Sequence, residues 1–272
     1  MTDPSKNLLI DNIDNKLSNV LHDLFNSSKL TDSAKVKIAS AFFSPAGFIK
    51  ISEPLTKISK VQILLGTEPN SNKGQWDKKL EETETSFINR QLQESIENQD
   101  KYIKKERDYF PFDQASSSSV KTMLTALKTG NIEVRRYEKN FLHAKAYLFK
   151  EDAHPENSVI IGSSNLTANG LSANLELNVS NHDPLVIKET EQWFDRLWDE
   201  SIPFDLASYF EEIFTPRDPF VIFLKVLWEL YGEEVLEEFI QDKKLPLTNF
   251  QKHGVERALR LIDQCGGVIV AD

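Results

Sequence analysis

FLHAKAYLFKEDAHPENSVIIGSSN, residues Phe141–Asn165, consists of an apolar run, a polar segment and a second apolar run. Alternate residues of a strand share a face, so the spacing predicts that His143 and Lys145 point to the same side. The polar segment holds a proline and several charged residues, as hairpin connections do. We therefore predict a β-hairpin whose second strand brings Ser163 and Asn165 beside the first pair.

The residue types of this hairpin suit a phosphate ester. An imidazole, an ammonium, a hydroxyl and a carboxamide provide a nucleophile or acid for the ester bond and donors for the charged oxygens. A buried hairpin with an incidental histidine is the alternative. The lysine two residues after the histidine and the Gly-Ser-x-Asn run on the next strand favour the phosphate interpretation.

His143-x-Lys145 followed by Gly162-Ser163-x-Asn165 resembles the signature of the phospholipase D superfamily. The resemblance implies that the histidine attacks phosphorus and forms a phosphohistidine, while the lysine and asparagine hold the oxygens without a metal. The family's usual aspartate falls seven residues after the histidine, where this chain has Lys150, with Asp152 nearby but out of register. Branches of the family related to restriction endonucleases and helicase-linked nucleases resemble this chain in not keeping that aspartate strictly. The replacement by Lys150 therefore argues against a lipase.

A glutamate after the Gly-Ser-x-Asn element recurs in phospholipase D-like nucleases, and Glu176 resembles it in position. We expect a strand over Leu175–Val179 with this glutamate at its centre, where its carboxylate would hydrogen-bond the histidine ring and set its tautomer. A strand carboxylate that faces water is the alternative. The predicted catalytic residues are therefore His143, Lys145, Ser163, Asn165 and Glu176.

Composition indicates a globular protein of one or two domains, with 272 residues, 40% hydrophobic and 27% charged. The net charge of −10 argues against a broad nucleic-acid-binding surface. The stretch Asn131–Lys150 nevertheless holds five basic residues against two acidic ones, which we interpret as a local phosphate-binding patch.

Several sequence features bear on location and cofactors. The single cysteine fits a reducing cytoplasm, and we find neither a signal peptide nor an apolar run of the roughly 20 residues that a membrane span needs. One cysteine and scattered histidines offer no zinc-ligand spacing. We expect a cytoplasmic protein with no membrane partner and no cofactor or metal in the nuclease domain.

The order of predicted elements indicates an α/β fold. A buried strand over Lys35–Phe43, a helix over Phe48–Leu55 and a strand over Val61–Leu65 imply a parallel pair with a crossover. Further predicted elements are one or two exposed helices over Trp76–Arg107, a helix over Val120–Lys128, a strand over Ile132–Tyr137 and a helix over Pro184–Trp198. We expect residues 1–200 to form a phospholipase D-like mixed sheet flanked by helices.

The last part of the chain gives a second resemblance. Prolines at 203, 216 and 219 favour a linker over residues 201–219, and residues 220–272 read as a helical connector and the start of a helicase-like domain. Six residues resemble the entry to a superfamily-two helicase or Swi/Snf-type DNA translocase: Phe250, Gln251, Gly266, Gly267, Ala271 and Asp272. In that family the ATP-binding loop follows directly, so ATP would belong to a helicase region beyond residue 272 of a longer protein.

The motif occurs once, and none of the other histidines (His22, His154, His182 and His253) is followed by a lysine two residues on. Because the family mechanism uses two histidines, we expect a homodimer that shares one active site. The predicted function is metal-independent cleavage of DNA by an endonuclease domain of a helicase–nuclease protein in restriction or defence. The alternatives are a non-catalytic phosphate- or DNA-binding and dimerisation module, and a phospholipase, which the lack of a basic amphipathic helix or lipidation signal disfavours.

Overall fold

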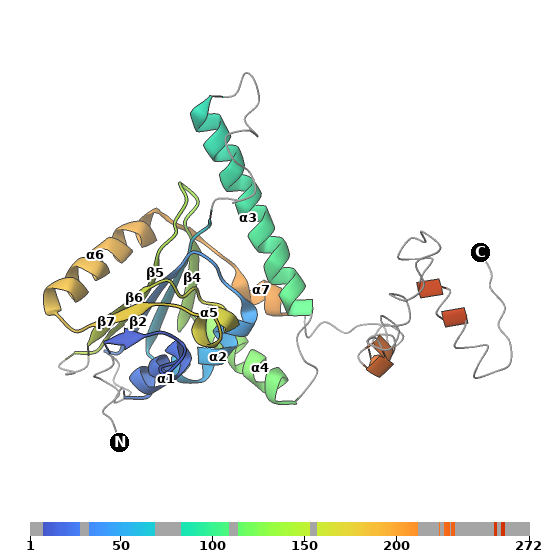
Figure 1. Ribbon diagram of the computed structural model, residues 1–272, viewed down its shortest axis with the longest axis horizontal. Coiled ribbons are helices and arrows are strands. Elements are labelled where there is room, and N and C mark those ends of the chain that lie inside the picture. The colour runs from blue at the N-terminus through green and yellow to red at the C-terminus, as the bar shows by residue number, and fades with distance from the viewer. Residues whose placement is uncertain are drawn as a thin grey trace. The chain divides into compact units, whose positions relative to one another are not determined.

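An eight-stranded mixed sheet in the order β1-β7-β6-β5-β2-β3-β4-β8 organises the protein (Figure 1). The computed structural model describes residues 8–27, 33–68, 83–108, 114–152 and 157–211, with isolated residues between 223 and 258. The strands are β1 Leu9–Ile10, β2 Lys35–Ser40, β3 Lys60–Leu65, β4 Ile132–Arg136, β5 Lys145–Lys150, β6 Ser158–Gly162, β7 Asn178–Asn181 and β8 Ile202–Pro203. The pairs β2–β3 and β3–β4 are parallel, and the other neighbours are antiparallel.

Helices cover both faces of this sheet (Figure 1). Helix α6, Pro184–Glu200, packs on one face, where Phe194 and Trp198 meet Ala39 and Leu64 of the central strands. The opposite face carries α1 Leu17–Ser27, α2 Pro45–Leu55, α4 Gln114–Lys128, α5 Ala168–Ser172 and α7 Leu206–Glu211. Helix α3, Glu84–Asp108, joins the same core through Ile103 and extends away from the sheet (Figure 1).

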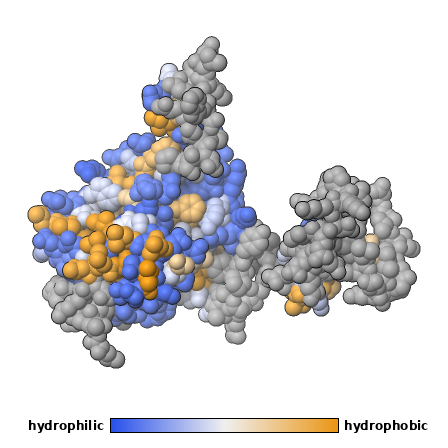
Figure 2. Space-filling view, viewed as in Figure 1, coloured by the Kyte–Doolittle hydropathy of each residue, from blue (hydrophilic) through white to orange (hydrophobic). Residues whose placement is uncertain are grey.

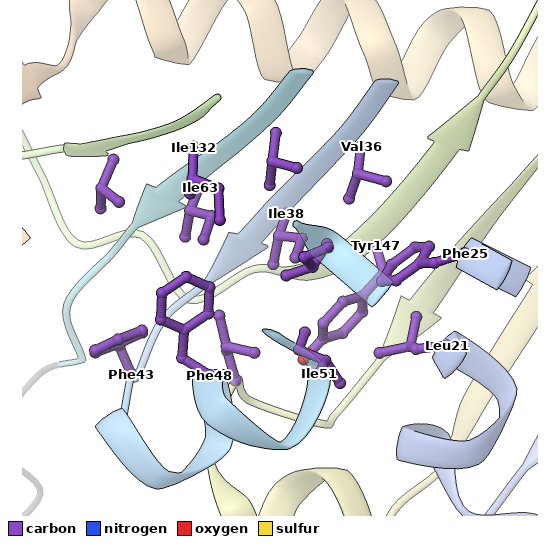
Figure 3. Close-up of a cluster of buried hydrophobic side chains, with 14 of the residues drawn as sticks. Leu21, Phe25, Val36, Ile38, Phe43, Phe48, Ile51, Ile63, Ile132 and Tyr147 are labelled. Atoms are coloured by element: carbon purple, nitrogen blue, oxygen red, sulfur yellow. The ribbon is translucent and has the colours of Figure 1, made fainter. Parts of the chain in front are cut away.

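The larger core lies between the sheet and α1 and α2 (Figure 3). Phe25, Phe48 and Ile51 of these helices pack against Ile38 and Tyr147 of the strands, and all five side chains are buried. Burial of a large apolar side chain stabilises a fold by roughly 1.5–3 kcal/mol. After their first residue, the two central strands β2 and β3 are buried on both faces, and the buried residues include the polar Lys37, Ser40 and Gln62.

The structure confirms the predicted fold class and the elements that lead to the motif. Strands β2 and β3 are parallel with α2 as their crossover, and β5 and β6 form an antiparallel hairpin in which Ala146 lies opposite Ile161. Helix α6 begins at Pro184 because Asp183 caps it, accepting hydrogen bonds from the backbone N–H groups of Leu185 and Val186.

The linker prediction is wrong for residues 201–211. Ile202 and Pro203 pair with Arg136 and Arg135 as the edge strand β8, and α7 follows with Leu206 and Phe210 buried in the core. An edge strand tolerates proline because one side of its backbone needs no partner, so Pro203 does not mark a break in structure.

Two other expectations also change. The described part of the segment predicted as one or two exposed helices is the single helix α3, whose Leu92 and Ile96 are buried. The helix predicted over Val120–Lys128 begins earlier, at Gln114, so the serine run before Val120 lies within α4.

The chain divides into two compact units, Met1–Phe214 and Thr215–Asp272. In the second unit the described residues include Trp228 and His253, whose ring centroids are 5.9 Å apart. The six helicase-like residues, from Phe250 to Asp272, lie outside the described residues. In the part of the chain that the structure describes, no helix has the length and apolar character to cross a membrane.

Candidate active site

The start of β5 carries the first two residues of the motif. His143 lies in the segment before the strand, and Lys145 is the first residue of the strand, so the strand that was predicted to carry both residues begins at the second of them. The two side chains still share a side, with His143 Nε2 2.7 Å from Lys145 Nζ. Lys145 is 6% exposed and His143 is 61% exposed, which leaves the imidazole accessible from solvent.

Asn165 is fixed beside them by the backbone of the segment after β2. Its Oδ1 accepts a hydrogen bond of 2.9 Å from the backbone N–H of Phe42. The hydroxyl of Ser40, at the end of β2, accepts from the N–H of Leu166 and so holds the next residue. Because the amide oxygen is used in this way, the Asn165 Nδ2 donor points to the other side, toward the motif.

A carboxylate that was not among the predicted site residues joins these three donors. Glu68 Oε1 lies 2.9 Å from His143 Nε2 and accepts hydrogen bonds of 3.4 Å from both Lys145 Nζ and Asn165 Nδ2. Its side chain is 37% exposed. One oxygen of Glu68 is therefore the point on which the imidazole, ammonium and carboxamide converge.

The approach of Glu68 to the motif depends on Gly66, which follows the end of β3. A Cβ on this glycine would lie 2.1 Å from the carbonyl oxygen of Leu142, so no larger residue fits without a backbone shift. The glycine is anchored by its N–H, which donates to Ser40, and by its carbonyl, which accepts from Gln99 Nε2. The end of β3 is thus held directly against the segment that carries His143.

Ser163 and Glu176 form a second group. The Ser163 hydroxyl donates to Glu176 Oε2 and accepts a 3.0 Å hydrogen bond from the backbone N–H of Leu177. Among the described residues, no hydrogen bond or ion pair links this group to His143, Lys145 or Asn165. The structure thus brings three of the predicted site residues together and places the other two in a separate pair.

The expected surroundings of Glu176 are wrong. Strand β7 begins at Asn178, so Glu176 precedes the strand instead of lying at its centre. The last pair between β6 and β7 is Gly162 with Asn178, and the backbone N–H of Glu176 donates to Asp11 instead of to β6. The carboxylate that contacts the histidine ring is Glu68.

Lys150, at the position of the family's usual aspartate, has a structural contact. Its Nζ lies 2.8 Å from Glu191 Oε2 on α6, and the other oxygen of Glu191 contacts Lys37 of β2 at 3.1 Å. Burial raises the pKa of Glu191, but the hydrogen bonds and charges of Lys150 and Lys37 outweigh this effect and leave the pKa below its ordinary value. This cluster ties α6 to the sheet.

Several basic residues of the patch predicted over Asn131–Lys150 make contacts within the fold. Arg136 contacts Asp100 at 2.6 Å and Glu138 at 2.7 Å, while Lys139 contacts Glu200 at 3.3 Å. The Arg135 guanidinium donates to the carbonyl of Trp198 and lies over its ring. Of the five basic residues, Lys145 is the one that joins the group around Glu68.

Tyr147 supports the site without titrating there. Its hydroxyl donates a 3.0 Å hydrogen bond to the carbonyl of Ser164 and is fully buried. Burial, with a smaller contribution from the charge of Glu176, raises the pKa of Tyr147 far above its ordinary value. The phenol therefore stays neutral and holds the Gly162–Asn165 turn to β5.

The described residues include no group of three or more His, Cys, Asp or Glu side chains that could hold a metal ion. The chemistry that the observed groups themselves offer is recognition of an anion by His143, Lys145 and Asn165. The exposed imidazole is also the group able to attack the anion's central atom.

The family described as "Cardiolipin synthase, PLD-like domain" matches residues 23–198, more than half of the chain. No curated protein sequence matches. Similar solved structures include Nuc from Salmonella typhimurium, a phospholipase D family member, with 12% identity, 72% of this chain and 95% of that chain covered, and a TM-score of 0.41.

Two further structures are similar over much of this chain. NucT from Helicobacter pylori is 18% identical, with 68% of this chain and 89% of that chain covered and a TM-score of 0.37. The phosphatidylserine synthase from Haemophilus influenzae Rd KW20 is 18% identical, with 84% of this chain and 46% of that chain covered and a TM-score of 0.44.

Proposed function

Because the chain belongs to the phospholipase D-like family, as the match over residues 23–198 shows, we propose that it is a phosphodiesterase that cleaves DNA without a metal ion. The observation that carries the proposal is the convergence of His143, Lys145 and Asn165 on one anionic oxygen. These are the groups that the family signature assigns to phosphate.

The proposed reaction has two steps. His143 Nε2 attacks phosphorus and displaces the ester oxygen of one nucleotide, which takes a proton as it leaves. Lys145 and Asn165 donate to the non-bridging oxygens and stabilise the charge that develops there. Water then attacks the phosphohistidine, which releases the second DNA end with its phosphate and restores the free imidazole.

The test is cleavage of plasmid and oligonucleotide DNA in EDTA by the wild type and by His143→Ala. We expect the variant to lose about 10²–10⁴-fold in rate, since a placed imidazole contributes that much. His22→Ala is the matched control, because His22 contacts Lys50 and Glu53 between α1 and α2 and touches none of the site residues. Equal cleavage by His143→Ala would assign the activity to a contaminant.

Three further substrates define the chemical class. RNA and single-stranded DNA are assayed in parallel with duplex DNA, and vesicles of phosphatidylglycerol are assayed for headgroup release. Hydrolysis of the vesicles by the wild type but not by His143→Ala, with no cleavage of nucleic acid, would replace DNA by a phospholipid as substrate.

The leaving oxygen needs a proton, and we propose that the His143 of a second copy supplies it. An exposed apolar surface supports this homodimer: Leu9, Ile161 and Val179 are neighbours across β1, β7 and β6, and Leu175 and Leu177 flank Glu176. Figure 2 shows apolar side chains gathered over these strands. Leu177 also donates its N–H to Ser163, so the surface reaches the Ser163–Glu176 pair.

Sedimentation at micromolar concentration tests the dimer. We expect the wild type to sediment as a dimer and Val179→Lys to shift toward monomer with reduced cleavage, because charge is then buried at an apolar contact. Leu185→Lys is the control, since Leu185 is equally apolar and 62% exposed but lies on α6. A wild type that is only monomeric contradicts the shared site.

A non-catalytic phosphate- or DNA-binding and dimerisation module is the second candidate. Two observations favour it. Lys150, at the usual aspartate position, makes a structural contact with Glu191, and Glu68 contacts the donors of the motif. Salt-dependent DNA binding by the wild type, with no cleavage in any of the assays above, would identify this function.

We also propose that the domain works with a DNA translocase in restriction or defence, and that it does so in the cytoplasm. The support is the resemblance of Phe250, Gln251 and the Gly266–Asp272 run to a helicase entry. The natural reading frame tests this: a glycine-rich phosphate-binding loop is expected immediately after residue 272, and a stop codon there contradicts the proposal.

A further inference from the structure

Glu68 holds the position that a phosphate oxygen would need. Its Oε1 lies 2.9 Å from His143 Nε2 and 3.4 Å from both Lys145 Nζ and Asn165 Nδ2. A carboxylate oxygen and a non-bridging phosphate oxygen are both anionic acceptors with the same demand for N–H donors. The three donors are therefore already satisfied by a group of the chain itself.

The contact is also incompatible with attack by the histidine. If Nε2 carries the proton, it donates to Glu68 and has no lone pair for phosphorus. If Nε2 is unprotonated, its lone pair accepts from Lys145 at 2.7 Å and faces a carboxylate at 2.9 Å. In either state the nitrogen that must attack is in contact with Glu68 instead of a substrate.

The anchoring of Glu68 shows that this contact is built into the fold. Gly66 is hydrogen-bonded to Ser40 and Gln99, there is no room for a Cβ between it and Leu142, and Thr67 is 2% exposed, so the backbone up to Glu68 has little freedom. The Glu68 side chain itself is 37% exposed, and the hydrogen bonds and ion pairs that it makes with other described residues are those with the motif. A fixed backbone with an exposed side chain suits a group that alternates between two positions.

We propose that Glu68 is an internal occupant of the anion site, and that a phosphodiester binds only when the Glu68 side chain has left His143, Lys145 and Asn165. Two anions cannot share these donors, since like charges at this distance repel. The apparent affinity for the phosphodiester is then the intrinsic affinity multiplied by the fraction of molecules in which Glu68 has left the three donors. The proposal deepens the proposed function, because it rests on these three side chains forming a phosphate site.

Titration with inorganic phosphate, followed by calorimetry and by the NMR signals of the His143 ring, tests the occupant without any cleavage assay. We expect Glu68→Gln to bind phosphate about tenfold more tightly than the wild type, because the charge that competes is gone while the size of the side chain is kept. Glu200→Gln is the matched control: Glu200 is a similarly exposed glutamate with a single lysine contact, 3.3 Å from Lys139. Its phosphate affinity should equal that of the wild type.

Glu68→Ala is a second variant that controls for any effect of the amide group introduced by glutamine. Thermal unfolding confirms that each variant is folded. Phosphate affinity that is unchanged or reduced in both folded Glu68 variants overturns the proposal, and so does a lack of measurable binding in both. If cleavage is active, KM for DNA should fall in Glu68→Gln with no reduction in kcat. A fall in kcat without tighter phosphate binding would instead make Glu68 a proton acceptor for His143.

The outcomes for this proposal and for the nuclease proposal are separable. Tighter phosphate binding by Glu68→Gln with no cleavage of DNA by any variant supports the occupant and rejects the nuclease. Cleavage that depends on His143, with equal phosphate affinity in the wild type and both Glu68 variants, supports the nuclease and rejects the occupant.

Discussion

The two ends of β5 carry the same residue type with different consequences. Lys145 begins the strand and contacts His143 and Glu68, whereas Lys150 ends it and contacts Glu191 of α6. The two positions differ by an odd number of residues, so their side chains lie on opposite faces of the sheet. One strand thus supplies a lysine to the candidate site and another to the packing of a helix.

The partners of the two lysines explain the difference. Glu191 lies on a helix that Phe194 and Trp198 already hold against the sheet, so its contact with Lys150 adds to an existing interface. Glu68 follows the end of a strand, and its oxygen also contacts a histidine and an asparagine, so three donors of different kinds meet on it. A lysine–carboxylate contact therefore points to a function when further donors converge on the same carboxylate oxygen.

The largest difference that we expect between the two lysines of β5 is in the rate of DNA cleavage. We expect Lys145→Met to reduce DNA cleavage by about 10²–10³-fold, the usual cost of removing one preorganised donor from a developing charge. Lys150→Met, at the other end of the same strand, should cleave within about threefold of the wild type. Rates in EDTA measure both, and equal losses in the two variants would contradict the division of roles.

The next largest effect is on stability, and we expect it to be larger for a lysine that contacts Glu191 than for Lys145. Lys37 is 8% exposed and contacts both Glu191 and Asp195, at 3.1 and 2.6 Å, so Lys37→Met leaves two carboxylates with less compensation. We expect a loss of about 2 kcal/mol in the free energy of unfolding, less than for a fully buried pair because Asp195 is half-exposed. Lys145→Met should change it by less than about 1 kcal/mol, since sites for ligands are rarely optimised for stability.

Urea unfolding of these two variants and of Lys60→Met makes the comparison quantitative. Lys60 is 49% exposed and 3.8 Å from Glu133, so its loss should cost well under about 1 kcal/mol. A Lys145→Met variant that is less stable than Lys37→Met would show that the site group is a packing element after all.

The sequence was sufficient for the hairpin and for the parallel pair. Alternation around Lys145 and Tyr147, a polar connection and the second apolar run specify β5 and β6 through local patterns. The same holds for β2, α2 and β3, where apolar runs are separated by the Ser44 cap and helix start. In each case the information lies within a short window of the chain.

The remaining features depend on contacts that such windows do not contain. Glu68 reaches Lys145 across 77 residues, and the contact exists because β3 and β5 both flank β2 in the sheet. The edge strand β8 has two residues and therefore no periodicity, and the proline in it suggested a linker. A carboxylate two residues after a strand-ending glycine was the available signal for Glu68, but that pattern alone has many structural explanations.

The smallest effect that separates the two ends of β5 is the pH dependence of stability. Lys150 and Lys37 lower the pKa of Glu191 below its ordinary value of 4.5, although burial alone would raise it. A depressed pKa in the folded state stabilises the protein above the ordinary value, and this contribution is lost as the pH falls through the lower, folded pKa. Because the Glu191 side chain is 19% exposed and Asp195 also contacts Lys37, we expect the contribution to be below about 1 kcal/mol.

Unfolding of the wild type and of Glu191→Gln, measured between neutral pH and pH 3, tests this expectation. The stability difference between the two should be largest at neutral pH and should shrink below pH 4.5, where the carboxylate of the wild type takes up its proton. Glu200→Gln is the control, because Glu200 is 40% exposed and has one lysine contact. A difference between wild type and Glu191→Gln that grows as the pH falls would mean that burial, not the two lysines, dominates at Glu191.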